Sequence, residues 1–296
     1  MLKSIFLGLI VTLIMSTVTF AQTINGDIQT GFNYNLNNET SEFFVKDVYL
    51  GVKHSFDDNW SVNTNVNYTG KDINLYNAEV HFSNNLMDNI DYSFRFGRIV
   101  NTWYLYTNEV WGNRFINEVS TDTYGLLNRT NDGLNGNVFF SDNDNNTIAI
   151  ASFEVQNFVK DESQKNSLFT GILFPVENLH LGGFYSYLNK EKIYGFNVGY
   201  EFTSKTMGDL NVSAEYDNKM DVFNVISVFG QYFVKDSPFS ILGKYELVKF
   251  DNGNTDINFN TFGLNYKANK NVDVGINYRT QTDLDGIFYF NTGITF

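Results

Sequence analysis

The chain of 296 residues contains no cysteine, two prolines and three histidines. The absence of thiols excludes a disulfide framework and a thiolate metal site, so stability has to come from the fold itself. After Gln22, no apolar run approaches the roughly 20 residues that a transmembrane helix needs. A chain with this pattern that enters a membrane therefore does so as strands.

Basic residues are also few, with 20 Lys and Arg against 33 Asp and Glu, for a formal net charge of -13. This acidic balance argues against a nucleic-acid partner. Aromatic residues are abundant, with 29 Phe and 18 Tyr, yet the mean hydropathy is slightly negative. Strands that each carry one apolar face and one polar face produce this combination.

The first 21 residues have the composition of a secretory signal peptide. Met1-Leu2-Lys3 is a short positive start, an apolar stretch covers 5–15, and Thr19-Phe20-Ala21 offers small residues before a cleavage site. A retained membrane anchor is the alternative, although the apolar stretch is short for a spanning helix. We expect residues 1–21 to be removed on export and residues 22–296 to form one domain.

The last residues alternate strictly between apolar and polar side chains. Phe288, Phe290, Ile294 and Phe296 fall on one side of the predicted strand, and residues such as Asn291 fall on the other. The same period of two recurs over 28–36, 60–68, 194–202, 210–217 and 272–279. Alternation with an outward apolar face is typical of a transmembrane β-barrel, so we predict an all-β, antiparallel transmembrane barrel.

We expect about 16 strands, with 14 as the alternative. The expected segments are 25–36, 42–56, 60–69, 74–83, 90–99, 131–141, 146–158, 166–174, 179–189, 192–203, 207–217, 220–234, 237–250, 256–267, 271–281 and 285–296. Bacterial barrels have an even strand number, short periplasmic turns and longer extracellular loops. With this count the long connection 100–130 is the third extracellular loop, and both prolines lie at or beside periplasmic turns, where a missing N–H is tolerated.

The long connection contains two Trp and two Tyr between positions 103 and 111. A loop of some 30 residues in a compact fold is usually functional or disordered, and its aromatic content argues against disorder. We interpret it as a loop that folds into the barrel mouth and narrows the pore. The alternative is an aromatic cap that lies on the rim or contacts a neighbouring subunit.

Three stretches, 96–103, 109–114 and 131–136, resemble outer-membrane porins of Gram-negative bacteria, in particular the broad group that includes the phosphate-selective porins. In that group, a strand ending in Gly-Arg, here Gly97-Arg98, leads into the constricting loop, and an Asp-Gly pair, here Asp132-Gly133, opens the next strand. The terminal Phe296 resembles the signal read by the outer-membrane assembly machinery. The resemblance implies a homotrimer with a contact near the first strands. The loop lacks the run of Lys and Arg that would carry phosphate selectivity over.

Alternation predicts which charges face the lumen. Counting alternate residues along the expected strands places the side chains of Glu79 and Arg95 inside the barrel. The same count places the side chain of Arg98 outside, unless a bulge at Gly97 turns it inward. We expect an eyelet in which acidic loop residues face arginines. The candidate pore residues are Glu79, Arg95, Arg98, Glu109, Arg114, Glu118, Asp122 and Arg129.

Enzymatic chemistry is disfavoured because His54, His81 and His180 lack a nucleophile in a recognisable setting. The run from Ser141 to Asn146 looks like a calcium loop but lacks the glycine and the distal glutamate of an EF-hand. We therefore expect no catalytic residue, no metal and no cofactor. No plug-sized domain or additional soluble domain is expected beside the barrel.

The sequence thus predicts an exported protein of the outer membrane that lets small hydrophilic solutes and ions diffuse passively, with weak cation preference. Its expected partners are the lipid bilayer and these solutes. The alternatives are an anion- or phosphate-selective porin, a closed structural barrel, and a barrel enzyme of the lipase or protease type.

Overall fold

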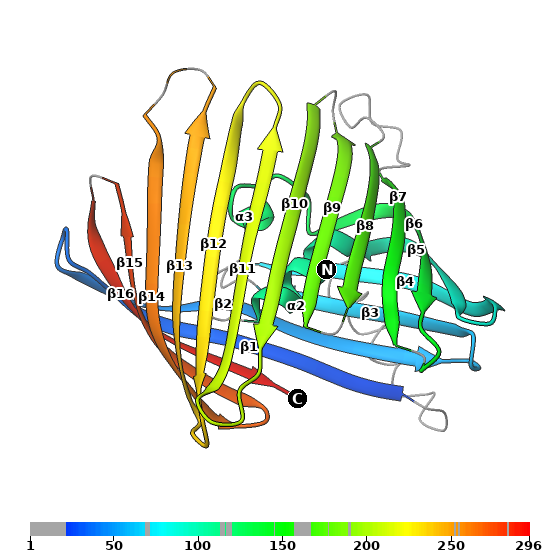
Figure 1. Ribbon diagram of the computed structural model, residues 1–296, viewed down its shortest axis with the longest axis horizontal. Coiled ribbons are helices and arrows are strands. Elements are labelled where there is room, and N and C mark those ends of the chain that lie inside the picture. Colours follow the sequence, from blue (N-terminus) through cyan, green and yellow to red (C-terminus); the bar gives the residue numbers. More distant parts are fainter. Residues whose placement is uncertain are drawn as a thin grey trace, which may run out of the picture.

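Sixteen antiparallel strands close into one barrel in the computed structural model, which describes residues 22–68, 72–112, 116, 120–144, 146–156, 167–176, 178–188, 191–251, 253, 255–282 and 284–296 (Figure 1). Each strand pairs with its neighbours in sequence, and β1 pairs with β16. The strands are β1 (Gln22–Asn35), β2 (Thr40–Ser55), β3 (Trp60–Tyr68), β4 (Ile73–Met87), β5 (Ile90–Val100), β6 (Thr130–Ser141), β7 (Thr147–Gln156), β8 (Ser167–Val176), β9 (Leu179–Leu188), β10 (Glu191–Phe202), β11 (Gly208–Lys219), β12 (Phe223–Val234), β13 (Phe239–Phe250), β14 (Ile257–Asn269), β15 (Val272–Gln281) and β16 (Leu284–Thr295).

The prediction of a 16-stranded antiparallel barrel is confirmed. Strand boundaries agree within a few residues, and the largest difference is at β4, which was expected to end at residue 83. The ladder with β5 continues instead through Asn84 and Asn85 to the pair Met87–Ile90. Asparagine is a common turn residue, but here the cross-strand pairing prevails. The expected signal peptide, 1–21, lies outside the described residues.

Closure depends on the pairing of the first strand with the last. The ladder runs from Asp27–Thr295 to Asn35–Ile287. It is completed by mutual backbone hydrogen bonds in which Gly26 N donates to Phe296 O at 2.9 Å and Phe296 N donates to Gly26 O at 3.0 Å. The sheet therefore has no free edge in the described chain, as a barrel requires.

Alternation places apolar side chains outside and polar side chains inside. Phe288 and Phe290 on β16 and the terminal Phe296 are 46%, 44% and 56% exposed, whereas Asn291, which faces the interior, is 1% exposed. The interior is rich in Asn, Ser and Gln side chains throughout the sheet. The outer surface is thus an apolar belt around a polar interior, the arrangement of a barrel built to sit in lipid.

One departure from simple alternation lies on β4. The pairing with β3 shifts between Asn65 and Val66, so that Tyr76 is an extra residue on β4. Uninterrupted alternation along β4 would turn Tyr76 toward lipid, but it packs against Tyr49 and against the apolar cluster around Val100 inside the barrel. Such bulges re-aim a side chain in this way.

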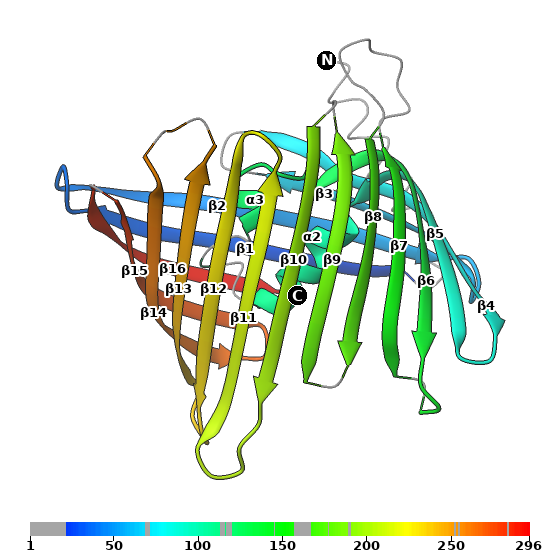
Figure 2. The same cartoon turned by 45° about the horizontal axis from the view of Figure 1, so that its top comes forward.

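The connection from β5 to β6 folds into the barrel interior (Figures 1 and 2). It contains two helices, α2 (Thr102–Trp111) and α3 (Ser120–Thr123). Neither these nor any other helix in the described residues is long and apolar enough to cross a membrane. The hydrophobic core consists of two clusters in which loop side chains pack on inward residues of β8–β13. The expected loop inside the barrel is therefore observed, and the rim-cap alternative is not.

We predict that Phe262→Arg on β14 destabilises the barrel in lipid. Phe262 is 61% exposed and sits at the centre of its strand, opposite Gly243 and Tyr278. A cation at the centre of the outward belt should lower the free energy of unfolding by about 2–4 kcal/mol. Denaturant titration in lipid vesicles measures this, with Phe262→Leu as control. Equal stability of the two variants would show that this face does not contact hydrocarbon.

Candidate functional site

The loop is anchored where it leaves β5. Asn101 caps the N-terminus of α2, and its side-chain oxygen accepts a hydrogen bond from Tyr104 N. Glu154 on β7 accepts hydrogen bonds from Thr102 N at 2.8 Å and from Asn101 Nδ2 at 3.1 Å. A carboxylate in this position satisfies free N–H groups and complements the positive end of the helix dipole. Glu154 therefore fixes the point at which α2 enters the lumen.

Arg95 and Asn135 extend this anchor across β5 and β6. Arg95 donates from Nε to Asn135 Oδ1 at 2.9 Å and from a terminal nitrogen to Thr102 Oγ1 at 2.8 Å. Asn135 in turn donates to Thr102 Oγ1 and to Glu154. Asn135 and Glu154 are completely buried, so the network acts in a medium where hydrogen bonds to charged groups are strong.

Aromatic packing holds α2 against the opposite wall. The Trp103 ring lies 4.7 Å from that of Phe184 on β9, and the Trp111 ring lies 4.3 Å from that of Phe229 on β12, measured between centroids. The helix approaches β9 closely because Gly182 has no side chain there. A β-carbon at Gly182 would lie 2.8 Å from Tyr106 Cε1 and 2.9 Å from Trp103 Cζ3.

Beyond α2, the loop contacts further strands around the barrel. Gly112 ends the helix with a φ of 65°, a conformation that favours glycine. Arg279 on β15 donates a hydrogen bond to Ile116 O. Ser120 Oγ at the start of α3 donates to Glu246 Oε1 on β13 at 3.2 Å. The loop thus reaches from β7 across the lumen to β15.

The loop returns to the sheet through Arg129, whose guanidinium lies 3.6 Å from Asp47 Oδ2 on β2 and 5.7 Å from the Tyr104 ring centroid. The two ends of the loop are joined by a hydrogen bond from Asn101 N to Arg129 O. Contacts with β2, β7, β9, β12, β13 and β15 mean that the loop spans the interior rather than lying on one wall.

The predicted pore residues occupy different positions. Glu79 and Arg95 face the interior as predicted, with 4.0 Å between Glu79 Oε2 and an Arg95 terminal nitrogen. Arg129 lies at the loop end beside Asp47. Glu109 lies in α2 and Asp122 lies in α3, but their side chains are outside what the structure describes. Arg114 and Glu118 are also outside the described residues.

Arg98 does not line the pore, which corrects its inclusion among the candidates. The register of β5 shows no shift at Gly97, so alternation continues and Arg98 faces outward. There it lies 3.8 Å from Asp132 on β6 and donates to Tyr76 O. Gly97 has a φ of 120°, yet this does not reverse the strand's alternation.

The sequence places several further residues of the site in the lumen but does not show what they contact. Glu154, Lys244 and Glu246 have inward parity, but parity alone does not show that Glu154 caps a helix or that Lys244 and Glu246 lie beneath the loop. Glu215 and Asp217 on β11 alternate with apolar residues and could have been identified as inward acids. Their closeness to Lys244 depends on which strands neighbour each other, which only the barrel order reveals.

The remaining chemical candidates are explained by local structure. Asp142, in the turn that resembles a calcium loop, accepts hydrogen bonds from Asp144 N and from the backbone and side chain of Asn146. These hydrogen bonds lower the pKa of the Asp142 carboxyl. Among the described residues, no group of three or more His, Asp or Glu side chains converges as a metal site.

The three histidines lie on different strands. His54 on β2 packs against Phe56, His81 on β4 is paired in the ladder with Arg95, and His180 on β9 lies 3.6 Å from Glu201. His81 also lies opposite Ser61 on β3, but no hydrogen bond to a serine or threonine hydroxyl is described for any of the three histidines. The described residues therefore show no assembled Ser–His–acid arrangement of the kind that hydrolases use.

Comparisons with known proteins place this fold in a class. No protein-family model and no curated protein matches the sequence. Among solved structures, a mutant of the Rh. blastica porin is similar with a TM-score of 0.67 and 11% identity, over 93% of this chain and 100% of that chain. OmpT, an outer membrane protein of Vibrio cholerae, in its trimer form, is similar with a TM-score of 0.62 and 15% identity, over 93% and 99%. The fold is therefore that of the 16-stranded porin barrel.

We predict that Glu154→Gln loosens the entry of α2. The amide can no longer accept both hydrogen bonds from Asn101 and Thr102, and a lost bond of this type costs about 1–3 kcal/mol. Amide hydrogen exchange in peptides covering 101–111 should accelerate roughly tenfold or more. Glu201→Gln, a half-exposed acid on β10, serves as control. Unchanged exchange in 101–111 would show that Glu154 does not hold the helix.

We also predict that Gly182→Val displaces α2 from the wall, because the new side chain would occupy the space of Tyr106 and Trp103. Trp103 is completely buried, so its fluorescence should shift to longer wavelength. Gly183→Val, one residue further and on the outward face, is the matched control. Identical spectra for both variants would contradict close packing of α2 on β9.

Proposed function

We propose that the protein is an outer-membrane porin through which small hydrophilic solutes and ions diffuse passively, with a weak cation preference. The observation that carries this proposal is a 16-stranded barrel with a polar interior and a loop that spans it. Barrels of 16–18 strands are wide enough for an aqueous channel. A loop anchored across such a channel reduces its cross-section and selects solutes by size.

The surroundings of the barrel follow from its outer surface. The apolar belt suits a lipid bilayer, and the predicted signal peptide would deliver the chain to the cell envelope. We infer that the protein resides in the outer membrane, and that, like the trimeric neighbour, it assembles as a homotrimer. We propose no enzymatic activity, since no hydrogen bond joins a histidine to a serine or threonine hydroxyl in the part of the chain that the structure describes.

Ion preference is set by fixed charges near the constriction. The chain is acidic overall, and Glu109, Glu118 and Asp122 belong to the loop. The alternative proposal, an anion-selective porin, draws on the exposed Lys53 of β2 and on Arg95 of β5, which lies three strands away on the same inner wall. We favour cations because Arg95 and Arg129 each lie beside an acid, Glu79 and Asp47.

Planar-bilayer recording of the refolded protein under a potassium chloride gradient tests the function. We expect discrete conductance steps and a reversal potential of the sign that cation preference gives. The anion-selective reading would instead give a reversal potential of the opposite sign. A folded, heat-modifiable barrel that produces no steps would contradict the porin proposal.

The loop acids should account for the selectivity. In the double variant Glu109→Gln with Glu118→Gln, we expect the cation-to-anion permeability ratio to fall toward unity, because two negative charges leave the constriction. The control is Asp58→Asn, an exposed acid in the turn between β2 and β3. If the wild-type protein, the double variant and the Asp58→Asn control have the same reversal potential, the loop acids do not contribute to the selectivity of the eyelet.

A further inference from the structure

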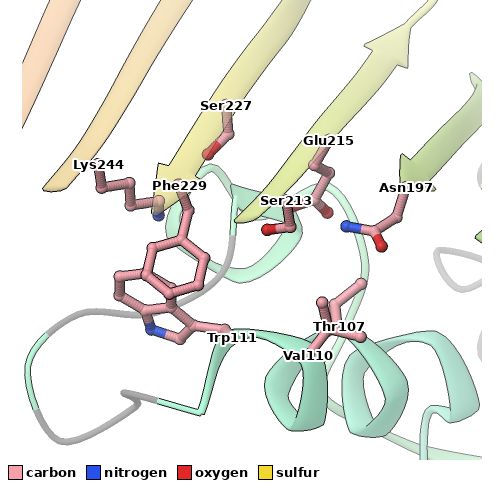
Figure 3. A pocket seen from close by; sticks show the side chains of 9 residues that line it. All are labelled: Thr107, Val110, Trp111, Asn197, Ser213, Glu215, Ser227, Phe229 and Lys244. Atoms are coloured by element: carbon pink, nitrogen blue, oxygen red, sulfur yellow. The ribbon is translucent and has the colours of Figure 1, made fainter. Parts of the chain in front are cut away.

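A small cavity of about 20 Å³ lies between α2 and the inner wall of the barrel (Figure 3). Thr107, Val110 and Trp111 line it from the helix. The strands contribute Asn197, Ser213, Glu215, Ser227, Phe229 and Lys244. A space of about 10–15 Å³ on this measure is enough for one water, so the cavity has room for one water or one small ion.

Two polar atoms at this cavity have no hydrogen-bond partner in the described part of the protein. Glu215 Oε1 and Asn197 Oδ1 are buried without a hydrogen-bond partner among the described residues. The two side chains are 8% and 7% exposed. Figure 3 shows Glu215, Asn197 and Ser213 pointing from the strands toward the gap above α2. Buried polar groups are normally paired, so something beyond the protein completes this site.

The charges indicate what that group is. Glu215, Asp217 and Glu246 are three buried acids, and Lys244 is the buried base beside them. Lys244 Nζ lies 3.0 Å from Glu246 Oε1 and 5.2 Å from the Trp111 ring centroid, so this ammonium is engaged with Glu246. Glu215 and Asp217 remain. A side-chain hydrogen bond joins these two carboxyls, which requires one shared proton, and Glu215 Oε1 still lacks a partner in the described chain. One negative charge is then left, which a water would not balance and a monovalent cation would.

We propose that the cavity binds one dehydrated alkali cation, Na⁺ or K⁺, which links α2 to the barrel wall. Its ligands are side-chain oxygens of Glu215, Asn197, Ser213, Ser227 and Thr107, and oxygen is the donor that hard cations prefer. The site lies at the C-terminal end of α2, where the helix dipole favours positive charge. Mg²⁺ retains several waters and Ca²⁺ takes six to eight oxygens, more than these five side chains supply, so the set of ligands suits neither.

Sodium-23 NMR of the refolded protein in detergent tests this proposal independently of any transport activity. Part of the excess sodium relaxation caused by the protein should be displaced by potassium chloride but not by tetramethylammonium chloride at equal ionic strength, because the organic cation is too large for the cavity. Glu215→Gln should lose this displaceable part. Glu201→Gln, which removes an acid elsewhere on the barrel, should keep it.

Ser213→Ala with Ser227→Ala removes two ligands without changing charge and should weaken sodium binding even if Glu215→Gln fails to refold. Heat-modifiable migration in gels verifies that each variant is folded. If tetramethylammonium displaces as much sodium as potassium does, the sodium is only a diffuse counter-ion of an acidic protein, and the proposal is overturned. The absence of a displaceable part at mildly alkaline pH would also overturn it, because a second proton on the pair of carboxyls would then take the place of the cation.

Discussion

The pairing of β1 with β16 is the constraint on which the rest of the structure depends. Strands that each bury one polar face cannot end in a free edge without leaving backbone N–H and C=O groups unpaired. Closing sixteen strands satisfies these groups but encloses an interior too wide for wall side chains to fill. The long loop between β5 and β6 is the part of the chain that occupies this space, and its composition follows from that task.

The loop combines two kinds of attachment with different physical roles. Apolar side chains such as Trp103 and Trp111 pack on inward residues of β9 and β12, which gives the loop its hydrophobic core. Charged and polar contacts at Glu154, Glu246 and Asp47 determine where the loop crosses the lumen. Packing alone would allow the helix to slide along the wall, whereas directional hydrogen bonds to a carboxylate fix its register. The charges that remain beside the opening can then set selectivity.

The sequence predicts the sheet well because period-two alternation is a local signal. Each strand shows its apolar and its polar face within about ten residues, and turns rich in Asn and Asp separate one strand from the next. The count of sixteen strands could therefore be predicted from the sequence. Departures such as the extra residue Tyr76 on β4 depend on pairing with β3, which no local pattern encodes.

The site was less predictable, for a similar physical reason. Alternation along the strands placed the side chains of Arg95 and Glu79 inside the barrel but left the orientation of Arg98 open. The uninterrupted register of β5 shows that Arg98 faces outward. The aromatic content of the loop indicated that it packs against something, but Gly182 and Phe184 become its partners only because the curved wall of the barrel brings β9, four strands from β5, within reach of α2. The capping of α2 by Glu154 likewise joins residues 52 positions apart. Contacts of this kind follow from closure and not from local sequence.

The central claim is that the loop lies inside the lumen while the protein conducts. Since the chain has no cysteine, a disulfide between Val110→Cys in α2 and Gly199→Cys on β10 tests it directly; a β-carbon at Gly199 would lie 3.2 Å from Val110 Cγ1, within reach of a disulfide. We predict that the bond forms on refolding and that conductance is the same before and after reduction. Failure of the bond to form in the folded barrel, or a channel that is closed until the bond is reduced, would contradict the account.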